Sequence, residues 1–132
     1  MKKVLLVASA ILLLASCQES LEERAAREAR EVTEAQCPKA VGNNLLLDSI
    51  VFDIPTLTQT QYFRFTGETD NDSMISAIMK TDVKGTLVYE LKNTANYKPL
   101  LGRGVCFRYI YRSNQNPEKT YIDITVNKED YQ

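Results

Sequence analysis

The sequence predicts an α+β fold in which an N-terminal helix precedes a ββαββ domain, with one main helix packed on a face of a four-stranded antiparallel sheet. Three observations support this prediction. Four short segments have strand-like patterns: the first is apolar almost throughout, and the other three alternate apolar and polar side chains. One longer segment, between the second and third of these, carries apolar residues three and four positions apart, as a helix does. Two strand pairs that flank a helix are typical of a sheet covered on one face.

The first residues have the proportions of a secretory signal. Lys2 and Lys3 precede an uncharged run, Val4–Ala15, which is shorter than the roughly 20 apolar residues that a membrane-spanning helix needs. The run ends in Leu-Ala-Ser-Cys at positions 14–17, which resembles the lipobox of bacterial lipoproteins. The resemblance implies that lipid is transferred to the Cys17 thiol, that the chain is cleaved before Cys17, and that the new amino terminus is acylated. An ordinary cleaved signal with a chance cysteine is the alternative.

This resemblance divides the chain into a signal peptide at residues 1–16, a lipid-anchored helical spacer at 17–37, and a small α+β domain at 38–132. Gln18, rather than an aspartate, follows the cysteine. By resemblance to lipoprotein sorting signals, this favours the outer membrane. The lipid anchor makes the membrane itself the first predicted partner.

Residues 19–36 are strong helix formers with opposite charges four positions apart. The apolar stripe of this segment is thin, consisting of Leu21, Ala25, Ala29, Val32 and Ala35. We therefore interpret it as a solvated spacer. The alternative is a packing or partner helix, because small alanines allow close approach. Cys37-Pro38 is expected to end the helix, since the residue before proline disfavours helical geometry.

The domain elements follow from the patterning. Strands are predicted at residues 45–53, 58–66, 105–112 and 120–126, and the main helix at 73–93, with one further short helical turn at 97–101. Gly85 lies inside the main helix, where it costs about 1 kcal/mol relative to alanine. We expect a kink or a close contact with the sheet at this position.

Four short stretches of this body resemble a group of small uncharacterised lipoproteins from Gram-negative gut bacteria. The stretches are Cys37-Pro38, Leu47-Asp48-Ser49, Gly104–Tyr111 and Asp130-Tyr131. The resemblance spans about Cys37 to Tyr131. It implies the same fold and an envelope location, and it brings no site residues.

Composition excludes several functions. The chain has no histidine, which removes the commonest metal ligand and general base. Without Lys2 and Lys3, the 16 basic residues become 14 against 17 acidic ones, so the mature net charge is −3 and no basic patch indicates nucleic acid. The sequence predicts no cofactor and no metal. Asp70-Asn71-Asp72 resembles the start of a calcium loop only faintly, and we interpret it as a helix cap.

The candidate binding residues are aromatic and basic side chains on the predicted strands: Tyr62, Arg64, Arg108, Arg112 and Tyr121. Tyrosine and arginine are enriched at binding hot spots, so this face of the sheet is predicted to bind a protein, peptide or glycan. The simpler alternative is that these residues only cover the solvent face. By the same alternation Tyr109 and Tyr111 share the face of Phe107, which assigns them to the core.

Cys37 and Cys106 remain after lipidation of Cys17, and they can pair in an oxidising compartment or stay free. The sequence thus predicts a non-enzymatic envelope lipoprotein with a binding or structural role. The alternative from another class is a small hydrolase or inhibitor-like domain with an unrecognised site.

Overall fold

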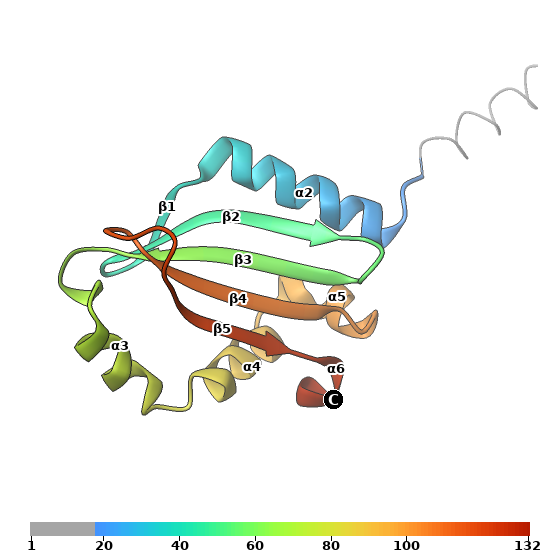
Figure 1. Cartoon of the computed structure of the whole chain (residues 1–132). Helices are drawn as coiled ribbons and strands as arrows, with labels where there is room; N and C mark the ends of the chain where they lie inside the picture. The colour runs from blue at the N-terminus through green and yellow to red at the C-terminus, as the bar shows by residue number, and fades with distance from the viewer. Residues whose placement is uncertain (1–17) are drawn as a thin grey trace, which may run out of the picture.

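The computed structural model describes residues 18–132 and shows an α+β fold (Figure 1). The elements in chain order are α2 (Leu21–Gln36), β1 (Lys39–Gly42), β2 (Leu45–Asp53), β3 (Thr58–Phe65), α3 (Asp72–Met79), α4 (Val83–Asn93), α5 (Lys98–Gly102), β4 (Cys106–Ser113), β5 (Thr120–Val126) and α6 (Lys128–Tyr131). Short 3₁₀ turns, η1 (Gly67–Thr69) and η2 (Ala95–Tyr97), precede α3 and α5. The predicted class and the four predicted strands are confirmed.

The sheet differs from the predicted one in strand number and direction. Among the described residues it has five strands in the order β1-β2-β3-β4-β5, and β3 pairs with β4 in parallel while every other pair is antiparallel. The predicted four-stranded antiparallel sheet is therefore wrong. The reason is the long connection between β3 and β4, whose helices carry the chain back to the edge where β3 begins, so that β4 starts in the same direction.

The fifth strand, β1, lies at the edge of the sheet and pairs only with β2. It is four residues long, its side chains are all exposed, and its register with β2 shifts between Ala40 and Gly42. A strand this short with no buried side chain has no alternating pattern in the sequence, so the patterning did not predict it.

The predicted main helix, residues 73–93, is two helices, α3 and α4. The break follows from local capping. Asn71 caps α3 by accepting a hydrogen bond from the Met74 amide at 2.9 Å, and Asp82 caps α4 by accepting one from the Gly85 amide at 3.0 Å. A Cβ atom on Gly85 would lie 2.0 Å from the Asp82 carboxylate, so a glycine is needed here for the Asp82 cap to form. The close neighbour of Gly85 is therefore this carboxylate, and not the sheet as the sequence suggested.

The N-terminal helix α2 packs on the sheet, which corrects the prediction of a solvated spacer. Ala25, Ala26 and Ala29 are buried in the hydrophobic core of the domain. The small side chains let the helix approach β2, along which it lies in Figure 1. The Thr33 hydroxyl accepts a hydrogen bond from the Ile50 amide at 2.9 Å and donates one to the Ile50 carbonyl at 3.1 Å. The alternative of a packing helix is therefore the one the structure supports.

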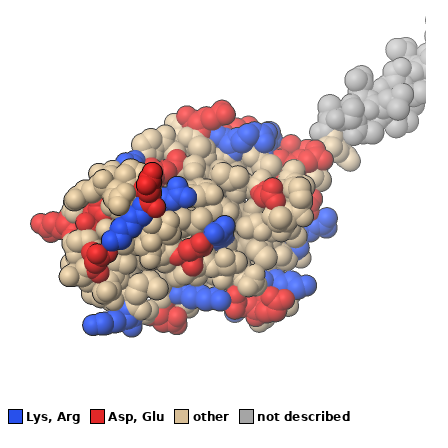
Figure 2. Space-filling model, in the orientation of Figure 1, with Lys and Arg blue, Asp and Glu red and all other residues tan. Residues whose placement is uncertain are grey.

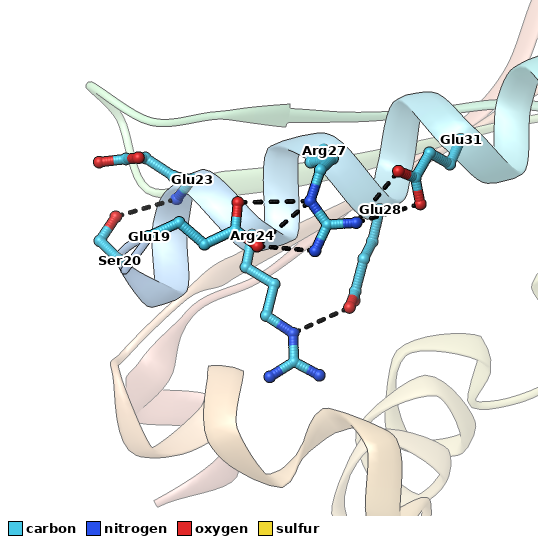
Figure 3. A network of polar contacts seen from close by, with 7 residues as sticks. All are labelled: Glu19, Ser20, Glu23, Arg24, Arg27, Glu28 and Glu31. Atoms are coloured by element: carbon cyan, nitrogen blue, oxygen red, sulfur yellow. Dashed lines mark hydrogen bonds and ion pairs between the residues drawn. The ribbon is translucent and has the colours of Figure 1, made fainter. Parts of the chain in front are cut away.

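Charged side chains cover the solvent side of α2 (Figure 3). Arg27 binds Glu19 at 2.6 Å and Glu31 at 3.0 Å, and Arg24 binds Glu28 at 2.9 Å. Ser20 caps the helix by accepting a hydrogen bond from the amide nitrogen of Glu23 at 3.1 Å. Exposed pairs of this kind contribute little stability each, so the buried alanine face fixes the helix position.

The core lies on one side of the sheet. Every second residue of β3 and β4 points toward the helices, including Phe63, Phe65, Phe107, Tyr109 and Tyr111, and all five are buried. The Phe63 and Tyr111 rings stack with centroids 4.7 Å apart, and the Phe65 ring also stacks with Tyr111, at 5.4 Å. The sequence assigned Tyr109 and Tyr111 to this face, and the structure confirms it.

Candidate functional site

Four of the five predicted binding residues share the open face of the sheet. Tyr62 and Arg64 come from β3, and Arg108 and Arg112 come from β4. They alternate with the buried aromatic residues, and Arg64 lies directly beside Arg112 in the register of the two strands. We call these four residues the Tyr/Arg face.

Internal contacts hold two of the three arginines. Arg64 donates to both carboxylate oxygens of Asp48 at 2.9 Å and to the Asn114 side chain at 2.6 Å. Arg108 donates to the two oxygens of Asp123 at 2.9 and 2.6 Å, and this contact raises the pKa of Arg108 and lowers that of Asp123. Both guanidinium groups therefore have a carboxylate partner already.

Arg112 is held differently. Its guanidinium carbon lies 5.3 Å from the centre of the Tyr62 ring, which is a cation–π geometry. None of the ion pairs found in residues 18–132 involves Arg112. Figure 2 shows acidic and basic side chains interspersed on the face turned to the viewer, with no large patch of one sign. Arg112 is thus a positive charge without a carboxylate partner, on a face where acidic and basic side chains are otherwise interspersed.

Tyr121, the fifth predicted residue, does not join the Tyr/Arg face. Its ring lies edge-on to Phe65 with centroids 6.2 Å apart, and its hydroxyl donates to Asp70 at 2.8 Å. Burial raises the pKa of Asp70, but hydrogen bonds from Ser113, from the Gln115 amide and from Tyr121 outweigh this and lower it below its ordinary value. Asp70 and Tyr121 therefore tie the loop before α3 to β5, and the assignment of Tyr121 to the binding face is wrong.

The helix-covered face contains a cavity of about 440 Å³ between α4 and the β1–β2 hairpin. Phe63, Tyr109 and Tyr111 form part of its floor, and Leu87 and Glu90 of α4 form part of its wall. Burial raises the pKa of Tyr111 to about 12, and the neighbouring Glu90 carboxylate adds to the shift. Burial, with nearby Tyr97, Tyr111 and Glu90, also raises the pKa of Tyr109.

A second cavity of about 340 Å³ lies between α2 and the α4–α5 connection, and Tyr97 lines both cavities. Sequence reasoning did not predict either cavity. Alternation places a tyrosine on one face of a strand, but it does not show which helix lies above that residue or how closely it packs.

The two remaining cysteines are free thiols. Cys37 lies just before β1, and Cys106 begins β4. In the strand order these two strands are three positions apart, and neighbouring strands lie about 4.8 Å apart. A disulfide needs Cα atoms within about 7 Å. The open question of the sequence is therefore answered in favour of unpaired cysteines. Burial, followed by the nearby Asp48 charge, raises the pKa of Cys37, which reduces its reactivity.

The predicted lipidation site, Cys17, and the signal peptide lie outside the described residues. Within residues 18–132 no helix is long and apolar enough to cross a membrane, and no group of three or more acidic or cysteine side chains is placed to hold a metal ion.

Comparison with known proteins first gives the class. Residues 1–18 match the model of a prokaryotic membrane lipoprotein lipid attachment site, so the chain is a bacterial lipoprotein, held in the cell envelope by lipid. Residues 20–122 match the family described as "Domain of unknown function (DUF8479)", and the chain belongs to that family. The match begins at the cap of α2 and so includes that helix. The narrower resemblance to lipoproteins of gut bacteria stays a prediction. A search of curated proteins found no match to the chain.

Three solved structures share the fold. A protein of Pseudomonas aeruginosa, described as secreted, has 12% identity and a TM-score of 0.63, covering 87% of this chain and 100% of its own. The pilotin EpsS of the Vibrio vulnificus type 2 secretion system has 16% identity and a TM-score of 0.61, over 85% of this chain and 92% of its own. The type II secretion system pilotin AspS of Vibrio cholerae has 18% identity and a TM-score of 0.56, over 89% and 97%.

Proposed function

We propose that this chain is a non-enzymatic outer-membrane lipoprotein whose folded body binds a protein partner in the cell envelope. Two of the structures with the same fold are pilotins of type II secretion systems, which supports a role in an envelope assembly. Gln18 beside the lipidated cysteine supports the outer membrane as its location. The observation that carries the proposal is the Tyr/Arg face, because it leaves one side of the sheet without a covering helix.

The geometry of this face defines the chemistry of the partner. Arg112 is stacked on Tyr62 and lacks a carboxylate, while Arg64 and Arg108 have one each. Tyrosine and arginine dominate binding hot spots because they combine a large contact area with directional polar groups. The partner therefore presents an acidic side chain to Arg112, next to an apolar group that packs on the Tyr62 ring.

The absence of a clustered pair of buried carboxylates in residues 18–132 supports a binding role over a hydrolase. Asp70 is the buried carboxylate of these residues, and Tyr121 and the Gln115 amide already engage its oxygens. A carboxylate held by such bonds is a structural group, because its lone pairs are satisfied inside the protein.

The anchor is tested by intact-mass spectrometry of the full chain extracted from membranes. We expect a mature mass that begins at Cys17 and includes diacylglyceryl and acyl groups, and we expect the Cys17→Ala variant to lack them. Density-gradient fractionation of the same cells should place the lipidated protein with the outer membrane. An unlipidated mass, or sedimentation with the inner membrane, would contradict this part of the proposal.

Partner binding is tested by photo-crosslinking of the full lipidated chain in cells. A photoreactive phenylalanine at Thr60, beside Arg108 on the open face, should give a discrete adduct with one protein. The same group at the exposed Lys92 of α4 serves as the control and should give no such adduct. Arg112→Ala should abolish the adduct, whereas Lys92→Ala should preserve it. Equal adducts at both sites, or an adduct that Arg112→Ala does not change, would contradict the proposal that a partner protein binds the Tyr/Arg face.

A further inference from the structure

The cavity between α4 and the β1–β2 hairpin lies on the helix-covered side of the sheet, opposite the Tyr/Arg face, and the proposed function does not use it. Its volume of about 440 Å³ is within the range of small-ligand pockets. Side chains of Phe63, Leu87 and Leu91 supply apolar walls. The cavity can therefore hold a short aliphatic chain.

Two buried tyrosines line this apolar space. Tyr109 and Tyr111 are only 5% and 9% exposed, and both line the cavity. Two tyrosines elsewhere in the core region have partners: the Tyr131 hydroxyl donates to the Val105 carbonyl at 2.9 Å, and the Tyr97 hydroxyl accepts from Gln61 at 3.4 Å. No hydrogen bond found within residues 18–132 involves the Tyr109 or Tyr111 hydroxyl, and neither oxygen is a fully buried atom without a partner.

The charge of the lining is negative. Glu90 is the charged residue among those of the described chain that line the cavity. It takes part in none of the ion pairs found in residues 18–132. Glu90 lines the same cavity as Tyr109 and Tyr111, and its charge adds to the effect of burial in raising the pKa of both tyrosines. Hydrogen-bond donors with a positive charge are therefore favoured here, and anions are disfavoured.

We propose that this cavity binds a primary alkylammonium group. The aliphatic chain packs between Phe63, Leu87 and Leu91, and the ammonium donates its hydrogens to the hydroxyl oxygens of Tyr109 and Tyr111 and to the Glu90 carboxylate. An ammonium has three donors and no acceptor, which matches three oxygen acceptors around an apolar space. A free amine and a lysine side chain of another protein share this chemistry.

The test is an NMR titration of the full lipidated protein in neutral detergent, with ¹³C-labelled tyrosine and leucine as reporters. The first pair of probes is n-butylammonium and pentanoate, which share a four-carbon chain and differ in charge. We expect n-butylammonium to bind at least about fivefold more tightly, with shifts at Tyr109, Tyr111 and Leu87. The second pair, N-acetyl-lysine amide and N-acetyl-norleucine amide, tests the side-chain source. We expect the lysine probe to bind more tightly than the norleucine probe.

Variants connect the binding to the named groups. Glu90→Gln should weaken n-butylammonium binding by about fivefold, and the Tyr109→Phe/Tyr111→Phe double variant should weaken it by a similar factor. Glu90 is exposed, and phenylalanine keeps the ring, so both variants should fold. Glu129→Gln, an exposed acidic residue of α6, is the matched control and should leave affinity unchanged. Pentanoate binding as tightly as n-butylammonium, or an affinity insensitive to Glu90→Gln, would overturn the proposal. Failure to detect a photo-crosslink at Thr60 would contradict the proposed function of the Tyr/Arg face but would not affect the proposal for this cavity.

Discussion

The two faces of the sheet are built from alternate residues of the same strands, yet different interactions stabilise them. On β4, Phe107 and Tyr109 point to the helices and are buried, while Arg108 and Arg112 point to solvent. Stacked and edge-on rings dominate the covered face, and ion pairs dominate the open one. Burial of apolar area stabilises far more than exposed charge does. The covered face should therefore govern stability, and the open face should govern recognition.

The largest expected effect is on the covered face. Phe107 is 1% exposed and contacts the rings of Tyr97 and Tyr131 edge-on. Phe107→Ala should lower the free energy of unfolding by about 3–5 kcal/mol, because it removes apolar contacts and leaves a cavity. Arg108→Ala, its neighbour on the open face, should cost less than about 1 kcal/mol. Urea denaturation of the two variants measures the difference, and equal losses would contradict the comparison.

The second effect appears at alkaline pH. The pKa of Tyr111 is raised from about 10 to about 12 by burial and by the Glu90 charge. Between these values the unfolded chain loses the phenol proton and the folded chain keeps it, so stability is complete below pH 10 and falls as pH rises toward 12. The slope from this residue approaches about 1.4 kcal/mol per pH unit.

Tyr111→Phe should therefore be less sensitive to pH than the wild type over this window. Tyr62→Phe on the open face is the control, since Tyr62 is only half-buried, and it should follow the wild-type curve. Denaturation midpoints between pH 9 and pH 12 test both variants. Parallel curves for Tyr111→Phe and the wild type would show that this hydroxyl titrates freely in the folded protein.

The third prediction concerns α2, where one helix has both kinds of surface. Ala29 is buried against the sheet, and its neighbour Arg30 is exposed. Ala29→Gln should cost about 1–3 kcal/mol of unfolding free energy, because a longer polar side chain does not fit between helix and strand. Arg30→Gln introduces the same residue and should change stability by less than about 0.5 kcal/mol. If both variants had the free energy of unfolding of the wild type, the packing of α2 on the sheet would not contribute to stability, as expected for a solvated spacer.

The sequence predicted those parts of the fold that depend on local patterning. Residues 45–53 are mostly apolar and residues 120–126 alternate, and the structure has strands with these bounds. The direction of β4 relative to β3 depends on the path that residues 66–105 take between them, and the local sequence pattern does not predict that path. The role of α2 was also misjudged, because an alanine face buries little area per residue and resembles a solvated helix in composition.

The candidate site shows the same division. Alternation placed Tyr62, Arg64, Arg108 and Arg112 on one face, because side chains of a strand point to opposite sides in turn. Tyr121 was misplaced because the pairing of β4 with β5 shifts between Tyr111 and Arg112. Glu90 was missed as a cavity residue because an exposed glutamate on a helix has no signature in sequence.

The smallest effect tests whether the Tyr/Arg face is available to a partner. Asp48 lies where the register of β2 with β3 shifts, and it accepts two hydrogen bonds from Arg64 at 2.9 Å. Both side chains are about one-third exposed, so a double-mutant cycle with Asp48→Asn and Arg64→Gln should give a coupling of about 0.5–1 kcal/mol. A coupling of this size leaves Arg64 free to exchange its internal partner for an acidic group of another protein. A coupling above about 2 kcal/mol would mean that the pair mainly stabilises the sheet, and recognition would then rest on Arg112 and Tyr62 alone.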